Sequence, residues 1–255
     1  MGLQRWASLL GFLAAGYPRE LLPAAAQRRP VGRGGPRAPM DLHTEALLRS
    51  TRARRAPTDL EMPLESARFI VFDVETTGFQ AHAGDEIIDL AAVEVVGRQA
   101  HPEHRFASLV RPRRRVRDEI LRLTGLDPER IEAAPPLAEV LAGFLAFAGD
   151  GILVAYGLRH DLSFLNAGCR RLYGLRVANR AIDAWQTARY LHPGLADHSL
   201  DTLIATYGVP SAGRRRHTAL GDSLLTAELW TGFVAALQDQ GITTLRALYA
   251  ALART

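Results

Sequence analysis

A short apolar run that ends in two carboxylates is the feature that most constrains the fold. Residues 68–73 (RFIVFD) are compact and β-prone, which predicts a central strand buried on both faces. The run continues into VETTG, so Asp73 and Glu75 are two residues apart and point to the same face. Two like charges this close are costly unless a positive group lies between them. The pattern favours a divalent cation, and oxygen ligands favour Mg²⁺ or Mn²⁺.

Apolar segments farther along the chain alternate between strand-like and helix-like patterns. Strands are expected at residues 86–96, 106–111, 151–156 and 181–182. Helices are expected at residues 118–123, 135–148, 161–173, 184–191, 199–207 and 218–238. Three strands in a meander, then strands separated by helices, predict an α/β fold with a mixed sheet and helices on both faces.

The N-terminal segment differs from the rest of the chain in composition. Residues 1–66 carry ten arginines against six acidic residues, whereas residues 67–255 carry 21 of each. Residues 27–39 are rich in Arg, Gly and Pro, which predicts a flexible linker between short helices before it and at 41–55. We expect folded structure to start near Ala67. The predicted organisation is a basic extension at 1–62, a domain at 63–240 and a C-terminal helix at 241–255.

The sequence gives only a weak indication of export and none of a membrane span. The chain has one cysteine, Cys169, so it cannot form an internal disulfide, and no apolar run approaches the roughly 20 residues of a membrane span. Residues 6–16 resemble a signal peptide only weakly, and we prefer an amphipathic helix or sequence upstream of a true start at Met40. We expect a cytoplasmic protein without membrane contact.

Two further segments contain acidic residues near predicted helix starts. In residues 154–166 (VAYGLRHDLSFLN), a buried strand leads through a glycine turn to Asp161, which is an N-cap, a metal ligand or both. In residues 214–228 (RRRHTALGDSLLTAE), Asp222 lies one turn inside a periodic helix and His217 just before it. Their separation of five residues places them on different sides of the helix start.

Four carboxylates and one histidine are the set that hydrolyses a phosphodiester with two metal ions. Metals about 3.5–4 Å apart would bracket the scissile phosphate, one activating water and the other stabilising the leaving oxygen. Histidine ordinarily titrates near neutral pH, so His217 is suited to accept the proton of the water. Taken singly, each group also has an ordinary interpretation: solvated acids at a strand end, a helix cap, an exposed histidine.

These three segments resemble motifs I, II and III of the DEDDh exonucleases, the family of the proofreading epsilon subunit of bacterial DNA polymerase III. The resemblance covers about residues 67–237, and FDVETTGF and H-x-A-x-x-D followed by TAEL are its specific motifs. The pieces LTGL (123–126), APP (134–136) and HSLD (198–201) also resemble the family. The resemblance implies a ribonuclease H-like fold. It implies two Mg²⁺ or Mn²⁺ ions held by Asp73, Glu75, Asp161 and Asp222, with His217 as the general base.

The resemblance also implies a binding site for the 3′-terminal nucleotide. Thr76, Thr77, Gly78 and Phe79 would border it, with backbone groups near the sugar and Phe79 near the base, and His217 would face it as well. The sister group carries a tyrosine four residues before its last aspartate. Thr218 stands there in this chain, which supports the histidine type.

The chain departs from the family at two places near the second motif. Many relatives have His-Asn where this chain has Tyr156-Gly157, and Phe where it has His160. Asp161 is retained, so the departures concern substrate contacts of that loop. His160 could approach the phosphate or pack under the loop, and we favour packing. Asp183 and Asp201 are expected to support structure or cap a helix.

Two arginine clusters are candidates for gripping the phosphates of the incoming strand. Residues 214–216 immediately precede His217, and we favour phosphate binding for them because of this neighbour. Residues 111–117 form a second cluster. A solvated surface is the ordinary interpretation of such a run, and the sequence leaves the role of this second cluster open.

The sequence therefore predicts a 3′→5′ exonuclease that releases nucleoside 5′-monophosphates from single-stranded or frayed 3′ ends of DNA, in proofreading or repair. Residues 76–78 (TTG) resemble the proofreading branch more than oligoribonuclease, which tends to carry Met-Thr-Gly. The alternatives are an RNA-directed exonuclease of the same superfamily, such as a ribonuclease T-like or oligoribonuclease-like enzyme, and a non-catalytic nucleic-acid-binding subunit of a polymerase assembly. Proofreading is expected to need a DNA polymerase or clamp in trans.

Overall fold

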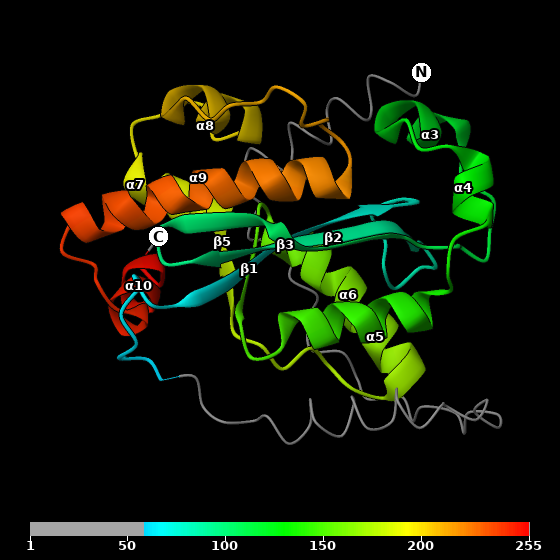
Figure 1. Ribbon diagram of the computed structural model, residues 1–255, viewed down its shortest axis with the longest axis horizontal. Coiled ribbons are helices and arrows are strands. Elements are labelled where there is room, and N and C mark those ends of the chain that lie inside the picture. The colour runs from blue at the N-terminus through cyan, green and yellow to red at the C-terminus, as the bar shows by residue number, and fades with distance from the viewer. Residues whose placement is uncertain (1–58, 255) are drawn as a thin grey trace. The chain divides into compact units, whose positions relative to one another are not determined.

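One mixed sheet forms the centre of the computed structural model, which describes residues 59–254 (Figure 1). The expected helices and linker at residues 1–58 lie outside this range. The strands are β1 (Arg68–Thr76), β2 (Ile87–Val96), β3 (Gln99–Leu109), β4 (Ile152–Ala155) and β5 (Ala181–Asp183), in the spatial order β3-β2-β1-β4-β5. β1 pairs antiparallel with β2 and parallel with β4. The predicted mixed sheet is therefore confirmed.

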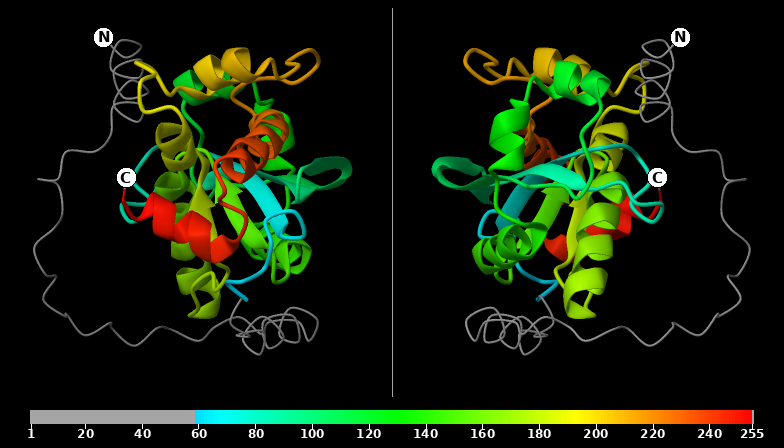
Figure 2. Two further views of the ribbon diagram at one scale, coloured as in Figure 1. Left: turned by 90° about the vertical axis from the view of Figure 1, so that its left-hand side faces the viewer. Right: turned by 90° about the vertical axis from the view of Figure 1, so that its right-hand side faces the viewer.

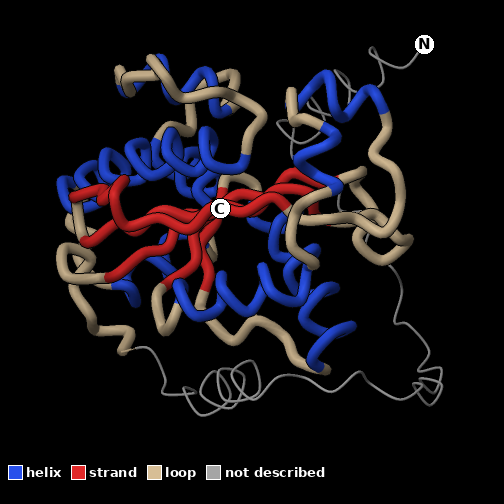
Figure 3. Tube along the Cα trace, turned by 45° about the vertical axis from the view of Figure 1, so that its right-hand side comes forward, coloured by secondary structure: helices blue, strands red, loops and turns tan. Residues whose placement is uncertain are grey.

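Helices cover both faces of this sheet, as Figure 3 shows. They are α3 (Asp118–Thr124), α4 (Pro128–Glu132), α5 (Leu137–Ala148), α6 (Leu158–Tyr173), α7 (Ala184–Leu191), α8 (Leu200–Tyr207), α9 (Ala219–Asp239) and α10 (Leu245–Leu252). Buried residues of α5 and α6 form one apolar cluster with the sheet. Buried residues of α7, α8, α9 and α10 form a second cluster, on the opposite face. The expectation of helices on both faces is thus also confirmed.

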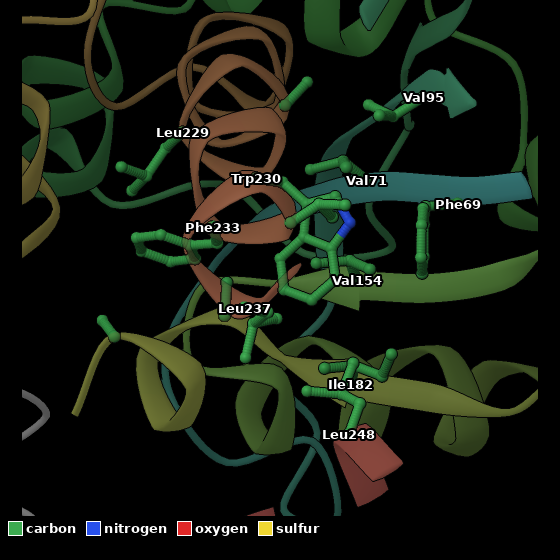
Figure 4. Packing of buried hydrophobic residues seen from close by; sticks show 14 of the residues in the cluster. Phe69, Val71, Val95, Val154, Ile182, Leu229, Trp230, Phe233, Leu237 and Leu248 are labelled. Carbon is green, nitrogen blue, oxygen red and sulfur yellow. The ribbon is translucent and has the colours of Figure 1, made fainter. Parts of the chain in front are cut away.

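The alternation of side chains along β1 explains how one strand serves both layers. Phe69 and Val71 join the cluster on the α9 face, while Ile70 and Phe72 join the cluster on the α5 and α6 face. Figure 4 shows Phe69 and Val71 packed against Trp230, whose ring centroid lies 5.2 Å from that of Phe69. The same period directs the next odd-numbered residues of β1 toward the α9 face.

β3 begins earlier than the sequence predicts, at Gln99 instead of residue 106. Residues 99–105 are polar and include a proline, so they do not resemble a buried strand. β3 is an edge strand of the sheet, and its pairing with β2 shifts register between Val93 and Glu94. An edge position with a bulge tolerates polar residues and proline, which explains the difference.

Two helices also differ from the prediction. α6 starts at Leu158, three residues before the expected start, because Gly157 adopts a left-handed conformation (φ 86°) and caps it. α4 was not predicted, since five residues are too few to show a helical period. The side chain of Asp127 caps α4 by accepting a hydrogen bond from the backbone N–H of Glu129 at 3.0 Å.

Residues 60–64, which precede the expected start near Ala67, are already part of the fold. The N–H of Leu64 donates to the carbonyl of Thr243 at 2.8 Å, the N–H of Arg246 donates to the carbonyl of Leu60 at 2.8 Å, and Leu64 is fully buried. These bonds tie residues 60–64 to the start of α10 (red in Figure 2). α10 lies beside β5 and shares the apolar cluster of α9. No helix within residues 59–254 combines the length and the apolar character that a membrane span needs.

Candidate active site

Three of the predicted carboxylates converge where β1 ends and α9 begins. Asp73 and Glu75 lie on β1, and Asp222 lies in the first turn of α9, which packs on the same face. Each offers a carboxylate oxygen, and these oxygens all lie within 4.8 Å of one another. The end of β1 and the start of α9 lie on the right of Figure 1, next to α3 and α4.

Asp161 reaches the same region from the other helical layer. It lies in the first turn of α6 with 3% of its surface exposed. Because Gly157 caps this helix, the interpretation of Asp161 as an N-cap is wrong. Pairing of β1 with β4 stops at Val71 and Val154, and beyond this point the backbone N–H of Val74 donates to Oδ1 of Asp161 at 3.3 Å. The structure thus holds Asp161 against the strand residue between Asp73 and Glu75.

Burial and mutual repulsion shift the protonation equilibria of these carboxylates. Burial raises the pKa of Asp73 well above its usual value, and the charges of Asp161 and Glu75 raise it further. Burial, followed by the charge of Asp222, raises the pKa of Glu75 to about 8. Burial also raises the pKa of Asp161, against the effect of the Val74 N–H. A site in which buried carboxylates repel one another is one in which a cation is strongly favoured.

A fifth carboxylate, Asp89 on β2, lies beside the site and was missed in the sequence. Asp89 pairs with Glu75 across the two strands and is 8% exposed. Its Oδ2 accepts a hydrogen bond from the N–H of Ala219 at 3.1 Å, which fixes the first residue of α9 to the sheet. Burial raises the pKa of Asp89 to about 6. The signal in the sequence is the acid within the apolar stretch IIDLAAV (87–93), and the place of Asp89 in the site depends on strand register.

The segment before α9 holds His217 in a conformation that is unusual for a residue with a side chain. His217 has φ 59°, in the left-handed region, and its N–H donates to Oδ2 of Asp222 at 3.2 Å. A Cβ on Gly221 would lie 1.8 Å from the carbonyl oxygen of Arg215, so only glycine allows the segment to approach the helix this closely. The side chain of Thr218 caps α9. The backbone of His217 is therefore fixed directly beside Asp222.

Arg216 is bonded to the carboxylate cluster itself. Its Nη1 donates to Oδ1 of Asp222, and its Nε donates to Oδ1 of Asp201 at 2.7 Å. The positive charge of Arg216 lowers the pKa of Glu75 and so counteracts part of the repulsion. Asp201 is thus an ion-pair partner of Arg216, whereas the N-cap of its helix, α8, is Ser199.

The other two arginines of this cluster also have partners within the chain. Arg214 pairs with Glu228 at 3.0 Å, and its side chain is 20% exposed. Arg215 donates to the carbonyl of Gly125, at the end of α3, at 3.4 Å. In this structure, residues 214–216 brace the start of α9, although the sequence analysis favoured them for phosphate binding.

The segment after β1 is folded tightly against the loop that precedes β2. The N–H of Thr77 donates to the carbonyl of Glu86 at 2.9 Å, and the hydroxyl of Thr76 donates to the carbonyl of Gly78 at 2.6 Å. A Cβ on Gly78 would lie 2.4 Å from a carboxylate oxygen of Asp85, so this glycine permits the close approach. The backbone that was predicted to border a terminal nucleotide is therefore held in place next to Glu75.

His160 packs among aromatic rings, as expected. Its ring centroid lies 5.6 Å from that of Phe79 and 4.9 Å from that of Phe164. Burial lowers the pKa of His160 to about 4, although the charge of Asp85 acts in the opposite direction. His160 is therefore neutral at physiological pH and backs the ring of Phe79.

Two residues hold the loop that leads into α6. The hydroxyl of Tyr156 donates to the carbonyl of His198 at 2.5 Å. The Oδ1 of Asp183 accepts hydrogen bonds from the N–H groups of Gly157 and Trp185, each at 3.0 Å. Asp183 thus caps α7 and positions the start of α6, which confirms the structural role expected for it.

The donor set fits a hard divalent cation. The converging ligand atoms are all carboxylate oxygens, and neither sulfur nor imidazole nitrogen is among them. Oxygen donors of this kind suit Mg²⁺ and Mn²⁺ better than Zn²⁺. A cation would also neutralise the repulsion that burial intensifies in this cluster. Asp73, Glu75 and Asp222, with Asp161 beside them, are thus the residues that could hold metal ions.

Comparisons with known proteins identify relatives for most of the chain. The sequence model of the RNase_T exonuclease family matches residues 70–230. The epsilon subunit of DNA polymerase III from Aquifex aeolicus is 34% identical over 179 residues, which cover 69% of this chain and 86% of the relative. An epsilon-like protein from Rhodobacter capsulatus is 35% identical over 188 residues, or 74% of this chain. The matched region spans only 27% of that relative's length.

A solved structure supports the same fold. The nuclease domain of 3′hExo, described as a DEDDh family member bound to rAMP, superposes with a TM-score of 0.59 at 22% sequence identity. The match covers 70% of this chain and 95% of that domain. The mixed sheet with helices on both faces is thus the ribonuclease H-like arrangement that this domain shares.

Proposed function

The chain belongs to the DnaQ-like 3′→5′ exonucleases of the DEDDh superfamily, and we propose that it removes nucleotides from 3′ ends of DNA with two divalent metal ions. The observation that carries this proposal is the convergence of carboxylate oxygens from Asp73, Glu75 and Asp222 within 4.8 Å. DNA is the favoured substrate because the relative from Aquifex aeolicus, matched over 86% of its length, is a subunit of a DNA polymerase. The same similarity supports proofreading or repair, with a polymerase as partner.

We assign the metal ions to Asp73, Glu75, Asp161 and Asp222. When bound, divalent ions at such a site would polarise the scissile phosphate and neutralise the charge that develops on it. The protein supplies the rigid support, because strand β1 and the first turns of α6 and α9 fix the four carboxylates. Mg²⁺ and Mn²⁺ both suit these donors.

We assign the role of general base to His217, which would accept the proton of the attacking water. Its backbone is held by the hydrogen bond to Asp222 and by the tight approach of its segment to Gly221. A non-glycine residue held at positive φ is strained, and such strain is often found at functional sites. The strained backbone of His217 therefore supports a functional role for its imidazole.

We assign the terminal nucleotide to residues 76–79. The hydrogen bonds of Thr76 and Thr77 order this backbone before substrate arrives, and the neutral ring of His160 supports Phe79 from behind. An aromatic ring held in this way is suited to pack on a base, because every base has a π-face. His217 would face the same nucleotide.

Digestion of 5′-labelled single strands tests this proposal. DNA and RNA of the same sequence are incubated with Mg²⁺, Mn²⁺ or EDTA, using the wild type and Asp161→Asn. A ladder that shortens from the 3′ end, needs metal and is absent in the variant supports the proposal, and faster loss of DNA than RNA supports the substrate assignment. If the wild type binds strands but leaves them intact with either metal, the chain is a binding subunit and the proposal fails.

A further inference from the structure

The loop between β3 and α3 carries positive charge that the proposed site does not use. Residues 111–117 contain five arginines and no acidic residue, whereas residues 67–255 as a whole are neutral. We call the side chains of Arg111, Arg113, Arg114 and Arg115 the basic surface. All four residues are exposed, and the side chain of Arg115 is 88% exposed. The positive charge of this surface is therefore local and accessible.

Hydrogen bonds attach this loop to the segment that we assign to the terminal nucleotide. Nη2 of Arg117 donates to the carbonyl of Thr77 at 3.1 Å. The backbone N–H and the Nε of Arg113 donate to the carboxylate of Glu86 at 2.8 and 2.7 Å. The N–H of Glu86 in turn donates to the hydroxyl of Thr77 at 2.9 Å. The basic surface thus begins directly beside Thr77.

The two arginine clusters differ in how their charges are compensated. Residues 214–216 have partners within the chain, as described above. By contrast, no acidic residue within 59–254 forms an ion pair with Arg111 or Arg114. Arg115 approaches Asp118 only at 3.6 Å, and an ion pair between groups this exposed contributes little. Arg111, Arg114 and Arg115 are therefore available to bind phosphate.

A groove of about 510 Å³ lies in this surface, and its lining is partly apolar. Val116, Leu121 and Ile131 line it together with the arginines, and Asp118 and Glu132 also contribute to its wall. Single-stranded nucleic acid is bound by such a combination, because phosphates meet cations while bases pack on apolar or planar groups. An acidic peptide would also match the arginines, but the position of this surface beside Thr77 favours the strand whose 3′ end we assign there.

We propose that the basic surface binds the backbone phosphates of the single strand that leads to the 3′-terminal nucleotide. This inference rests on the proposed function, because a strand whose 3′ end lies beside Thr77 must continue across the neighbouring surface. The contact is with phosphates, so it does not depend on base sequence and it weakens with salt. Its role is to hold a long strand between successive cleavage steps.

The test is a triple variant, Arg111→Gln, Arg114→Gln and Arg115→Gln. Arg113 and Arg117 are left intact, because they support buried Glu86 and the carbonyl of Thr77. The matched control removes three exposed arginines elsewhere: Arg98→Gln, Arg105→Gln and Arg254→Gln. Binding of a labelled strand of about 15 nucleotides, of a trinucleotide and of a blunt duplex is measured by fluorescence anisotropy in EDTA at several salt concentrations. Melting curves confirm that both variants fold.

We expect the triple variant to bind the long strand about 10–100-fold more weakly at low salt, with a salt slope smaller by about 2. Trinucleotide binding and the control variant should change less than about 3-fold, since neither involves the basic surface. Equal losses in the two variants would overturn the proposal, because total charge would then be the cause. If only binding of the blunt duplex is weakened, the proposal is overturned, because the basic surface would then bind the second strand of a duplex.

Trinucleotide cleavage separates this inference from the proposed function. If the wild type shortens the trinucleotide with Mg²⁺ and the triple variant does so at the same rate, the catalytic site is intact and the binding data decide the role of the surface. If the wild type cleaves no strand, the proposed function fails. The anisotropy comparison would still show whether the basic surface binds single strands.

Discussion

The two halves of β1 place opposite kinds of side chain against α9, although their side chains alternate in the same way. In the first half, Phe69 and Val71 are fully buried against the apolar residues of α9. In the second half, Asp73 and Glu75 face the same helix and lie close to Asp222. Burial of a large apolar side chain contributes about 1.5–3 kcal/mol, whereas burial of like charges opposes folding. The first half of the strand therefore stabilises the fold, and the second half destabilises it.

The carboxylate half should dominate activity, and Asp73→Asn tests this most strongly. We expect a loss of at least about 10⁴-fold in kcat, because one oxygen ligand and one negative charge disappear from the cluster. The same change should raise the melting temperature of the metal-free protein, since it removes repulsion from Glu75 and Asp161. Single-turnover rates and melting curves in EDTA measure the two effects.

Asp150→Asn is the matched control, because this exposed residue precedes β4 and lies outside the cluster. Its rate and melting temperature should equal those of the wild type. A metal-free Asp73→Asn protein that melts below the wild type would contradict the idea that the cluster opposes folding.

The apolar half should dominate stability, and Phe69→Ala tests it. Phe69 packs edge-on against Trp230 with a centroid distance of 5.2 Å, and both are fully buried. Removal of the ring should lower the free energy of unfolding by about 3–5 kcal/mol. Denaturant unfolding measures this loss, while the rate per folded molecule should stay within about 3-fold of the wild type. A rate loss comparable to that of Asp73→Asn would mean that the two halves are not separable.

His217 should affect both activity and stability, because its side chain is the proposed base and its backbone is strained. His217→Gly should lower kcat by about 10²–10³-fold through loss of the base. It should also stabilise the fold by about 1 kcal/mol, because glycine adopts positive φ without strain. His217→Asn is the companion variant, since asparagine tolerates this conformation better than most residues. If both variants keep wild-type rates, the histidine is not the base.

The carboxylate half should also make stability depend on pH. The pKa values of Glu75, about 8, and Asp89, about 6, lie above those of unfolded carboxylates, so the folded protein binds more protons. Stability in EDTA is therefore fully present below about pH 4 and falls as pH rises from there through about 6 and about 8, the folded-state pKa values. Denaturant titrations from pH 5 to about 8.5 measure this. A constant or rising stability over that range would contradict the raised pKa values of these carboxylates, and Mg²⁺ should flatten the profile.

Much of this arrangement was predictable from local patterns. The period of β1 predicted that Asp73 and Glu75 share one face, and the pattern of residues 214–228 predicted that Asp222 lies one turn inside a helix. The resemblance to the DEDDh exonucleases, not the patterns alone, implied that these carboxylates belong to one site. The ion pair of Arg216 with Asp201 and the contact of Asp89 with Ala219 could not be read from sequence, because they depend on strand register and helix docking. For the same reason, the sequence favoured residues 214–216 for phosphate binding, although their side chains are engaged within the chain.

The number of Mn²⁺ ions that each chain binds decides whether the carboxylate cluster is a metal centre. Binding is measured by titration calorimetry and by the electron paramagnetic resonance signal of free Mn²⁺, with a nucleoside 5′-monophosphate present, for the wild type, Asp73→Asn and Asp150→Asn. We expect two ions in the wild type and in Asp150→Asn, and at least one fewer in Asp73→Asn. Equal binding by all three proteins, or no binding by the wild type, would contradict the assignment of the carboxylate cluster as a metal centre.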